Sequence, residues 1–174
     1  ICTVYVICGT GDFVAGGFLA ETAGRGLPSG GVLCLLFLMM IVGGAVKAGV
    51  MPLHSWLPSA MVAPTPVSAL LHAVAVVKAG AFCVLRVVCY VFGPQLSIAC
   101  GGAQVLAWAA ALTIIVSSFI ALRKDNLKAR LAFSTVGQLS YIVMGICVCA
   151  QASLAGALFH MAAHAFLKIT LFMC

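Results

Sequence analysis

Long apolar runs separated by short polar or proline-rich stretches dominate the chain. Residues 31–46 are almost wholly apolar, residues 96–122 contain no charged side chain, and residues 131–167 carry no Asp, Glu, Lys or Arg. A membrane-spanning helix needs about 20 mainly apolar residues. Each run is therefore close to or beyond the length of one crossing, and the third is too long for a single one.

The pattern predicts five spans, separated by short connections, at residues 31–50, 67–92, 96–122, 127–149 and 153–174. Residues 1–30 are expected to hold the end of one transmembrane helix followed by an extramembrane connection. We expect residues 31–174 to form the main transmembrane domain, which is incomplete and holds about five helices. Because the chain starts and stops inside apolar runs, we expect it to be a piece of a longer membrane protein.

Prolines interrupt the chain just after the first span, beyond Lys47. A proline inside a helix removes a backbone donor and clashes with the preceding turn. We therefore expect the span to end or unwind near Lys47, with Pro52 and Pro58 marking the break and a short helix over residues 53–62. Pro66 is well placed to open the next span.

Composition agrees with a membrane location. Hydrophobic residues make up 64% of the 174 residues and charged residues 7%, against roughly 25% charged residues in soluble domains. Such a chain cannot cover a water-facing surface, which excludes a soluble enzyme, a disordered chain and a nucleic-acid-binding protein. The predicted fold is all-α: a polytopic transmembrane helical bundle that contains a proline-broken helix.

The basic residues set the expected orientation. Four of the nine Lys and Arg residues lie in residues 123–130, between two predicted spans. The positive-inside rule places this loop in the cytoplasm or in an organelle matrix. We predict a multi-pass protein of a bacterial or archaeal plasma membrane, in preference to the inner mitochondrial membrane.

Six ionisable side chains lie inside the predicted spans or at their breaks: Lys47, His72, Lys78, His160, His164 and Lys168. A lysine at the bilayer centre costs about 2.5–3.5 kcal/mol on insertion scales, and such residues usually face a bundle interior or a water path. Lys47 and Lys78 could instead extend their amines to the membrane surface. Arg86, nearer a helix end, is expected to be an anchor.

The last span contains the most regular pattern. His160, His164 and Lys168 recur every four residues, with apolar residues between them. Each step of four turns an α-helix by about 400° and rises about 6 Å, so the three form one stripe. Because histidine titrates near neutral pH and burial disfavours a charged lysine, this stripe is suited to a proton relay.

Two other interpretations of these histidines stay open. His160 and His164 could bind copper or zinc, although a zinc protease helix needs Glu where this chain has Met161. They could also hydrogen-bond between helices without any transport role. The nine cysteines form no CxxC pair and are interpreted as apolar fillers. We expect no metal site and no cofactor, because no flavin, iron–sulfur or quinone pattern is present.

Three segments together resemble a known family: KAGVMPLHSWLPSAMVAPTPVSALLHAVAVVKAG, DNLKARLAFSTVGQLSYIVMGI and ALFHMAAHAFLKITLF. They are similar to the antiporter-like proton-pumping subunits of respiratory complex I. The same signature occurs in Mrp-type cation/proton antiporters and in membrane-bound hydrogenases. The resemblance covers most of residues 31–174 and implies two inverted five-helix repeats, each with a helix broken inside the membrane.

The resemblance also implies roles for individual residues. Lys47 falls at the lysine of the first broken helix, which in the family pairs with a glutamate on an earlier helix. His72 matches the histidine of the next helix, and the three residues of the stripe match the histidines and central lysine between two half-channels. Two positions of this chain depart from the usual family pattern. Ser59 stands where Asp is usual, and Lys78 matches a lysine found only in some members.

The predicted function is proton translocation across the membrane, as a non-redox, antiporter-like subunit of an NADH:quinone oxidoreductase-type complex, through a buried Lys/His relay. Expected partners are other membrane subunits, the bilayer, and protons with Na⁺ or K⁺ as further candidates. The alternatives are a Na⁺(K⁺)/H⁺ antiporter subunit of an Mrp-type complex, an ion-pumping hydrogenase subunit, or a helix-packing subunit without an ion path. The three acids, Asp12, Glu21 and Asp125, all lie in connections, so an intramembrane acid is expected from elsewhere in the protein or from a neighbour.

Overall fold

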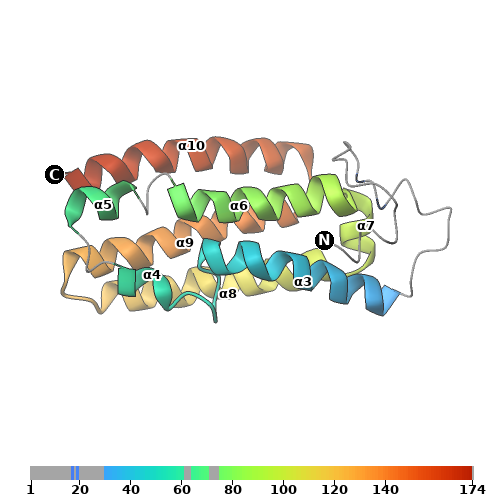
Figure 1. Cartoon of the computed structure of the whole chain (residues 1–174), viewed down its shortest axis with the longest axis horizontal. Helices are drawn as coiled ribbons and strands as arrows, with labels where there is room; N and C mark the ends of the chain where they lie inside the picture. Colours follow the sequence, from blue (N-terminus) through green and yellow to red (C-terminus); the bar gives the residue numbers. More distant parts are fainter. Residues whose placement is uncertain (1–16, 18, 20–29, 61–63, 71–74, 174) are drawn as a thin grey trace.

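The computed structural model describes residues 17, 19, 30–60, 64–70 and 75–173. Every regular element longer than a turn in these residues is a helix, which confirms the all-α prediction. In chain order these are α3 (Gly30–Ala48), α4 (Trp56–Ser59), α5 (Thr65–Leu70), α6 (Val76–Arg86), the π-helical η4 (Val87–Phe92), α7 (Pro94–Ala99), α8 (Gly102–Leu122), α9 (Leu127–Cys147) and α10 (Gln151–Met173) (Figure 1).

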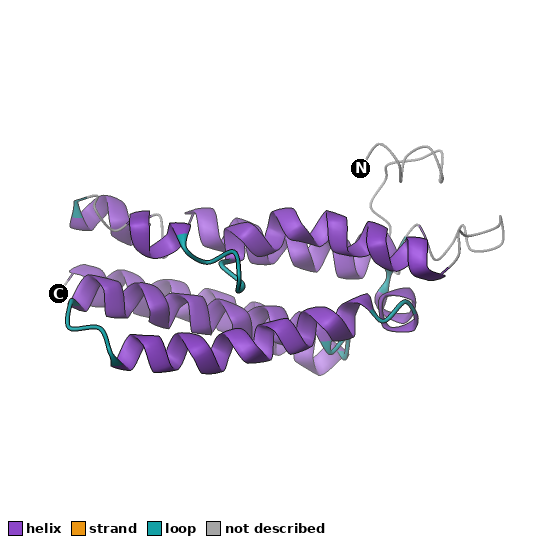
Figure 2. Cartoon of the chain, turned by 90° about the horizontal axis from the view of Figure 1, so that it is seen from below, coloured by secondary structure: helices purple, strands orange, loops and turns teal. Residues whose placement is uncertain are grey.

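The helices lie side by side in two layers (Figure 2). One layer holds α3 packed against α6, and the other holds α9 between α8 and α10. Contacts of α6 with α9, and of α5 with α10, join the layers. The apolar core runs between them and includes Phe37 and Phe92, whose rings meet edge to face with centroids 5.0 Å apart. Helix α9 is thus the central element of the described bundle.

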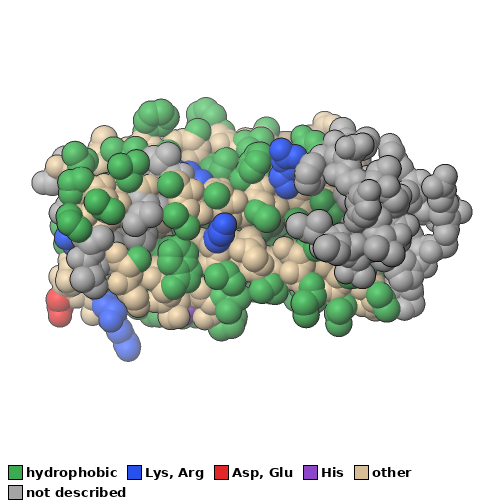
Figure 3. Space-filling view, viewed as in Figure 1, with side chains coloured by type: hydrophobic (Ala, Val, Ile, Leu, Met, Phe, Trp, Pro, Cys, Tyr) green, Lys and Arg blue, Asp and Glu red, His purple; other side chains and the backbone are tan. Residues whose placement is uncertain are grey.

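Four helices, α3, α8, α9 and α10, are long and apolar enough to cross a membrane. Their outer faces carry exposed large apolar side chains. Trp108 of α8 is 73% exposed and Phe159 of α10 is 79% exposed. Hydrophobic side chains are spread over the face shown in Figure 3. Such a surface is stable only against lipid or further apolar helices, so the chain is an integral, multi-pass membrane protein.

Two of the five predicted spans, 67–92 and 96–122, differ in detail from the structure. The 67–92 span corresponds to α5, α6 and η4, with residues 71–74 outside the described part. The span predicted at 96–122 is confirmed by α8, but it begins six residues later than predicted, because α7 ends at Ala99 and α8 begins only at Gly102. Gly101 between them adopts a left-handed conformation with φ of 71°, which glycine accepts without steric strain. A run without charge gives no sign of such a break.

Helix α3 ends near Lys47, as expected, but a glycine shapes the end before any proline is reached. Gly49 has a φ of 74°, and its N–H donates to the Val46 carbonyl while the Val50 N–H donates to the Ala45 carbonyl. This pair of bonds is a Schellman motif, which satisfies the last carbonyls of a helix. The Trp56 indole N–H also donates to the Val46 carbonyl, at 2.7 Å.

Helix α9 begins directly after the basic loop. The Asn126 side chain accepts a hydrogen bond from the Lys128 backbone N–H at 3.1 Å and caps the helix, the usual role of asparagine at this position. In Figure 3 acidic and basic side chains lie at this end of the bundle, and further basic side chains lie along the face. Residues 123–130 hold four Lys or Arg residues against one acid, Asp125. The end of the molecule with the α8–α9 loop is thus the positively charged one, which the positive-inside rule assigns to the cytoplasm or matrix.

Candidate functional site

The ionisable stripe of α10 faces into the bundle. His164 and Lys168 are each only 4% exposed, and His160 is half-buried. On the opposite face, Phe159 and Phe166 are 79% and 74% exposed. The polar side of this helix is therefore the buried side, the reverse of a helix in a soluble protein. A buried polar side of this kind needs partners within the bundle.

Helix α9 supplies two of those partners. The His160 Nε2 atom lies 2.8 Å from Gln138 Oε1, and the Lys168 amine donates to the Leu131 carbonyl at 3.2 Å. The same carbonyl accepts a hydrogen bond from the Thr135 hydroxyl at 2.8 Å. Because Leu131 and Gln138 are seven residues apart, two helical turns, they lie on one face of α9. That face runs alongside the α10 stripe.

His164 lies at the centre of the stripe. Its ring is stacked on that of His160, with centroids 6.3 Å apart and planes 25° apart. Both of its ring nitrogens are buried and have no hydrogen-bond partner among the described residues. Lys78 of α6 and Lys168 both lie within electrostatic range of it. His164 is therefore the point where titratable groups of α6 and α10 come together.

Lys47 occupies a different environment. It is the last residue but one of α3, and its side chain is exposed in the described bundle. Helices α3 and α6 meet closely here: a Cβ atom added at Gly80 would lie 2.7 Å from the Lys47 Cβ and 2.6 Å from the Ala48 nitrogen. Lys78, two residues before Gly80, is half-buried. The two lysines thus sit on a pair of helices whose spacing is set by a glycine.

The outcome for four further predicted positions is brief. His72 lies outside the described residues. Ser59, which stands where the family usually has Asp, ends α4, is exposed, and donates its hydroxyl hydrogen bond to the Ser55 carbonyl at 3.0 Å. Pro58 lies inside α4, and Pro52 lies in the turn between α3 and α4. The serine hydroxyl is thus engaged locally within its own short helix.

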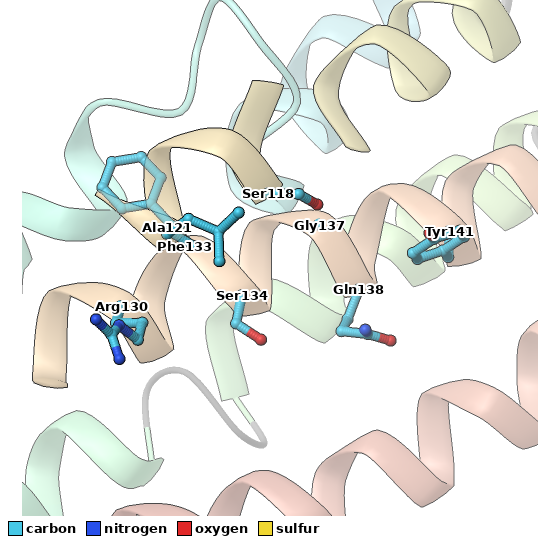
Figure 4. Close-up of a pocket in the computed structure, with 9 residues that line it drawn as sticks. Ser118, Ala121, Arg130, Phe133, Ser134, Gly137, Gln138 and Tyr141 are labelled. Atoms are coloured by element: carbon cyan, nitrogen blue, oxygen red, sulfur yellow. The ribbon is translucent and has the colours of Figure 1, made fainter. Parts of the chain in front are cut away.

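A groove of about 440 Å³ lies between α8 and α9 (Figure 4). Its lining includes Arg130, Ser134, Gln138 and Tyr141 from α9 and Ser118 from α8. The first and last of the α9 residues are eleven positions apart, so the groove follows α9 for about 16 Å at 1.5 Å per residue. It extends from the basic end of the bundle to the residue that holds His160.

Three features of this region were not predicted from the sequence: Gln138, the Leu131 carbonyl and His54. His54 lies in the turn before α4, with its ring 6.1 Å from that of Phe133 and a buried Nδ1 atom without a partner among the described residues. Gln138 could have been identified as a candidate because it is a polar residue within an apolar span. No sequence signal identifies a backbone carbonyl as the partner of a lysine.

Comparison with known proteins places the chain in a family. The family model described as NADH:quinone oxidoreductase/Mrp antiporter, TM, matches residues 1–174. NAD(P)H-quinone oxidoreductase chain 5 of Synechocystis sp. is 36% identical over 172 residues, 98% of this chain and 24% of the relative. NADH-ubiquinone oxidoreductase chain 5 of Cryptococcus neoformans is 37% identical over 142 residues, 81% of this chain and 20% of the relative.

Solved structures agree. A chain in the structure of the Mrp complex from Dietzia sp. superposes with a TM-score of 0.82 and 33% sequence identity, over 99% of this chain and 18% of that chain. The present chain thus spans less than a quarter of the length of these relatives. With a match along its whole length and an α-helical membrane bundle in common, the chain belongs to the NADH:quinone oxidoreductase/Mrp antiporter transmembrane family.

Proposed function

We propose that this chain is part of an antiporter-like subunit that moves protons across the membrane within an NADH:quinone oxidoreductase-type complex. The observation that carries the proposal is the buried stripe of His160, His164 and Lys168 on α10. Ionisable groups buried in a membrane helix are costly and usually serve ion or proton movement. The names of the curated relatives, quinone oxidoreductase chain 5, support the choice of complex.

Protons would pass along the stripe by exchange between neighbouring groups and the water between them. The stacked rings of His160 and His164 form one step, and Lys168, one turn further on, forms the next. Lys78 and Lys168 both act on His164 electrostatically. In a medium of low dielectric constant, a proton on one of these groups opposes a proton on another, so arrival of a proton at one position promotes release at the next.

Lys47 and His72 would extend the relay towards the first half of the subunit. Lys47 would need a carboxylate partner, because the one acid in the described residues, Asp125, is exposed in the basic loop. We propose that this partner comes from another part of the full-length protein or from a neighbouring subunit. No residue of this chain is assigned a flavin, iron–sulfur cluster or quinone, so electron transfer would take place in other subunits.

His164→Gln tests the proposed role of the stripe. Glutamine keeps a polar side chain of similar size but cannot bind a proton near neutral pH. In the complex reconstituted into liposomes and driven by NADH and quinone, we expect a several-fold lower rate of proton translocation, measured with a pH-sensitive dye. Unchanged translocation in a fully assembled complex would contradict the proposal.

A cation/proton antiporter is the second candidate, favoured by the likeness to the Mrp complex chain. The two candidates differ in what drives the protons. In liposomes without NADH, an imposed Na⁺ or K⁺ gradient moves protons only through an antiporter. For the leading candidate we expect no cation-driven proton movement, whereas NADH-driven movement is expected without added Na⁺. Cation-driven exchange that disappears in His164→Gln would establish the antiporter instead.

A further inference from the structure

Gln138 of α9 connects two features that were described separately. It lines the groove between α8 and α9, and its Oε1 atom contacts the His160 ring. We propose that Gln138 is a positioning residue, which holds His160 as the tautomer protonated at Nε2 and leaves Nδ1 to take up the incoming proton. This inference deepens the proposed function and rests on it, because it assigns a direction to one step of the relay.

The contact has the geometry of a full hydrogen bond. At 2.8 Å, the distance between His160 Nε2 and Gln138 Oε1 is at the short side of the usual range for nitrogen and oxygen. An amide oxygen only accepts hydrogen bonds, so the histidine nitrogen must be the donor. In the neutral ring, the other nitrogen then carries the lone pair. The bond therefore fixes the tautomer of His160.

The same bond fixes the plane of the ring. A histidine attached only at its Cβ can rotate about its terminal side-chain torsion, which has a broad and shallow preference. With Nε2 held by α9, the His160 ring lies 25° from parallel to the His164 ring, at a centroid distance of 6.3 Å. Gln138 thus sets the orientation of His160 relative to the next member of the stripe.

A neutral amide suits a carrier that must both gain and lose a proton. The Gln138 oxygen accepts from Nε2–H in the neutral ring and in the protonated ring alike. A carboxylate at this place would form an ion pair with the protonated ring and favour that state strongly. The amide therefore orients the ring without adding an opposite charge that would retain the proton.

The groove gives this residue access to the polar end of the bundle. Figure 4 shows Gln138 and Ser134 projecting from the same side of α9, with Arg130 further along. The groove is about 16 Å long and has a lining of both apolar and polar side chains, so water beside Arg130 and Ser134 would reach the Gln138 amide from the end that carries the basic loop. We therefore expect His160 to exchange protons with that side, through the Nδ1 atom that the bond to Gln138 leaves without the ring proton.

Nitrogen NMR of the histidine rings tests the proposal directly. In the full-length subunit within its complex, labelled with ¹⁵N-histidine, the His160 signals are identified as those that disappear in His160→Phe. We expect the Nε2–H tautomer to dominate in the unaltered protein and in Gln104→Leu, a control at an exposed glutamine of α8. Gln138→Leu should give a mixture of tautomers, and Gln138→Glu a protonated ring.

Proton translocation by the same variants completes the test. Gln138→Leu and Gln138→Glu should both translocate protons several-fold more slowly than Gln104→Leu. If Gln138→Leu retains the pure Nε2–H tautomer, the positioning role is wrong, whatever the transport rate. If the tautomer changes as expected but transport does not, the relay through His160 is wrong, and the failure lies with the proposed function. If the Gln138→Leu subunit does not assemble, Gln138→Asn is used in its place. The shorter asparagine side chain also moves the amide oxygen away from the His160 ring.

Discussion

A complex that carries Lys168→Met in this subunit will translocate protons at least about a hundredfold more slowly than the unaltered complex, the lower end of the effect of removing a well-placed proton carrier. Lys168 is 4% exposed and lies one turn beyond His164 on the stripe. Methionine fills nearly the same volume with an apolar chain, so packing changes little. What is lost is the only amine on α10 and its bond to the Leu131 carbonyl. Proton uptake or release by the reconstituted complex, followed with a pH-sensitive dye, measures the effect.

Lys168→Arg separates proton transfer from a purely structural role. Arginine keeps the positive charge and can donate to the Leu131 carbonyl, but it does not release its proton in proteins. A relay therefore requires Lys168→Arg to be nearly as inactive as Lys168→Met. If the lysine only tied α10 to α9, the arginine variant would retain transport. Lys124→Met is the matched control, because Lys124 is exposed in the basic loop, and native gels verify that every variant assembles.

Gly80→Val is expected to destabilise the subunit and to displace Lys47. A Cβ atom at Gly80 would lie 2.6 Å from the Ala48 nitrogen and 2.8 Å from the Gly44 carbonyl oxygen. These are backbone atoms of α3, which cannot rotate away, so the two helices must separate. Forcing extra atoms into a close-packed contact typically costs about 1–3 kcal/mol. The thermal unfolding temperature of the purified complex should fall, and proton translocation should fall with it.

Gly43→Ala is the control for this variant. Gly43 lies on the same helix as Gly44, but apart from the adjoining backbone of α3 itself, no atom of the described residues lies within 4 Å of a Cβ placed there. Alanine is the better helix former by about 1 kcal/mol, so the control should be as stable as the unaltered protein or more so. Equal thermal stability of Gly80→Val and Gly43→Ala would mean that α3 and α6 do not pack as described.

The sequence alone could predict the spans and the stripe, because both follow from periodicity along one helix. Hydrophobic runs located α3, α8, α9 and α10 to within a few residues, and spacing by four placed His160, His164 and Lys168 on one face. The break at Gly101 could not be predicted in this way. It depends on a backbone conformation that leaves no trace in the pattern of apolar residues.

The sequence alone also could not predict which side chains contact one another between helices. The contacts of Gln138 with His160 and of Leu131 with Lys168 depend on how α9 is rotated and shifted against α10. Ridges and grooves along the whole length of both helices set that register. The close approach of α3 to α6 at Gly80 has the same origin. His54 lies in a turn outside the predicted spans, where an ionisable side chain is common and gives no signal.

The Leu131 carbonyl has two side-chain donors, the Thr135 hydroxyl and the Lys168 amine. A buried carbonyl that loses its sole donor is penalised by roughly 1–3 kcal/mol. Here the threonine continues to donate whenever the amine changes its protonation or moves away. The hydrogen bonding of this α9 carbonyl would therefore persist when Lys168 gains or loses a proton in the proposed relay, and α9 would stay in place beside the moving charge.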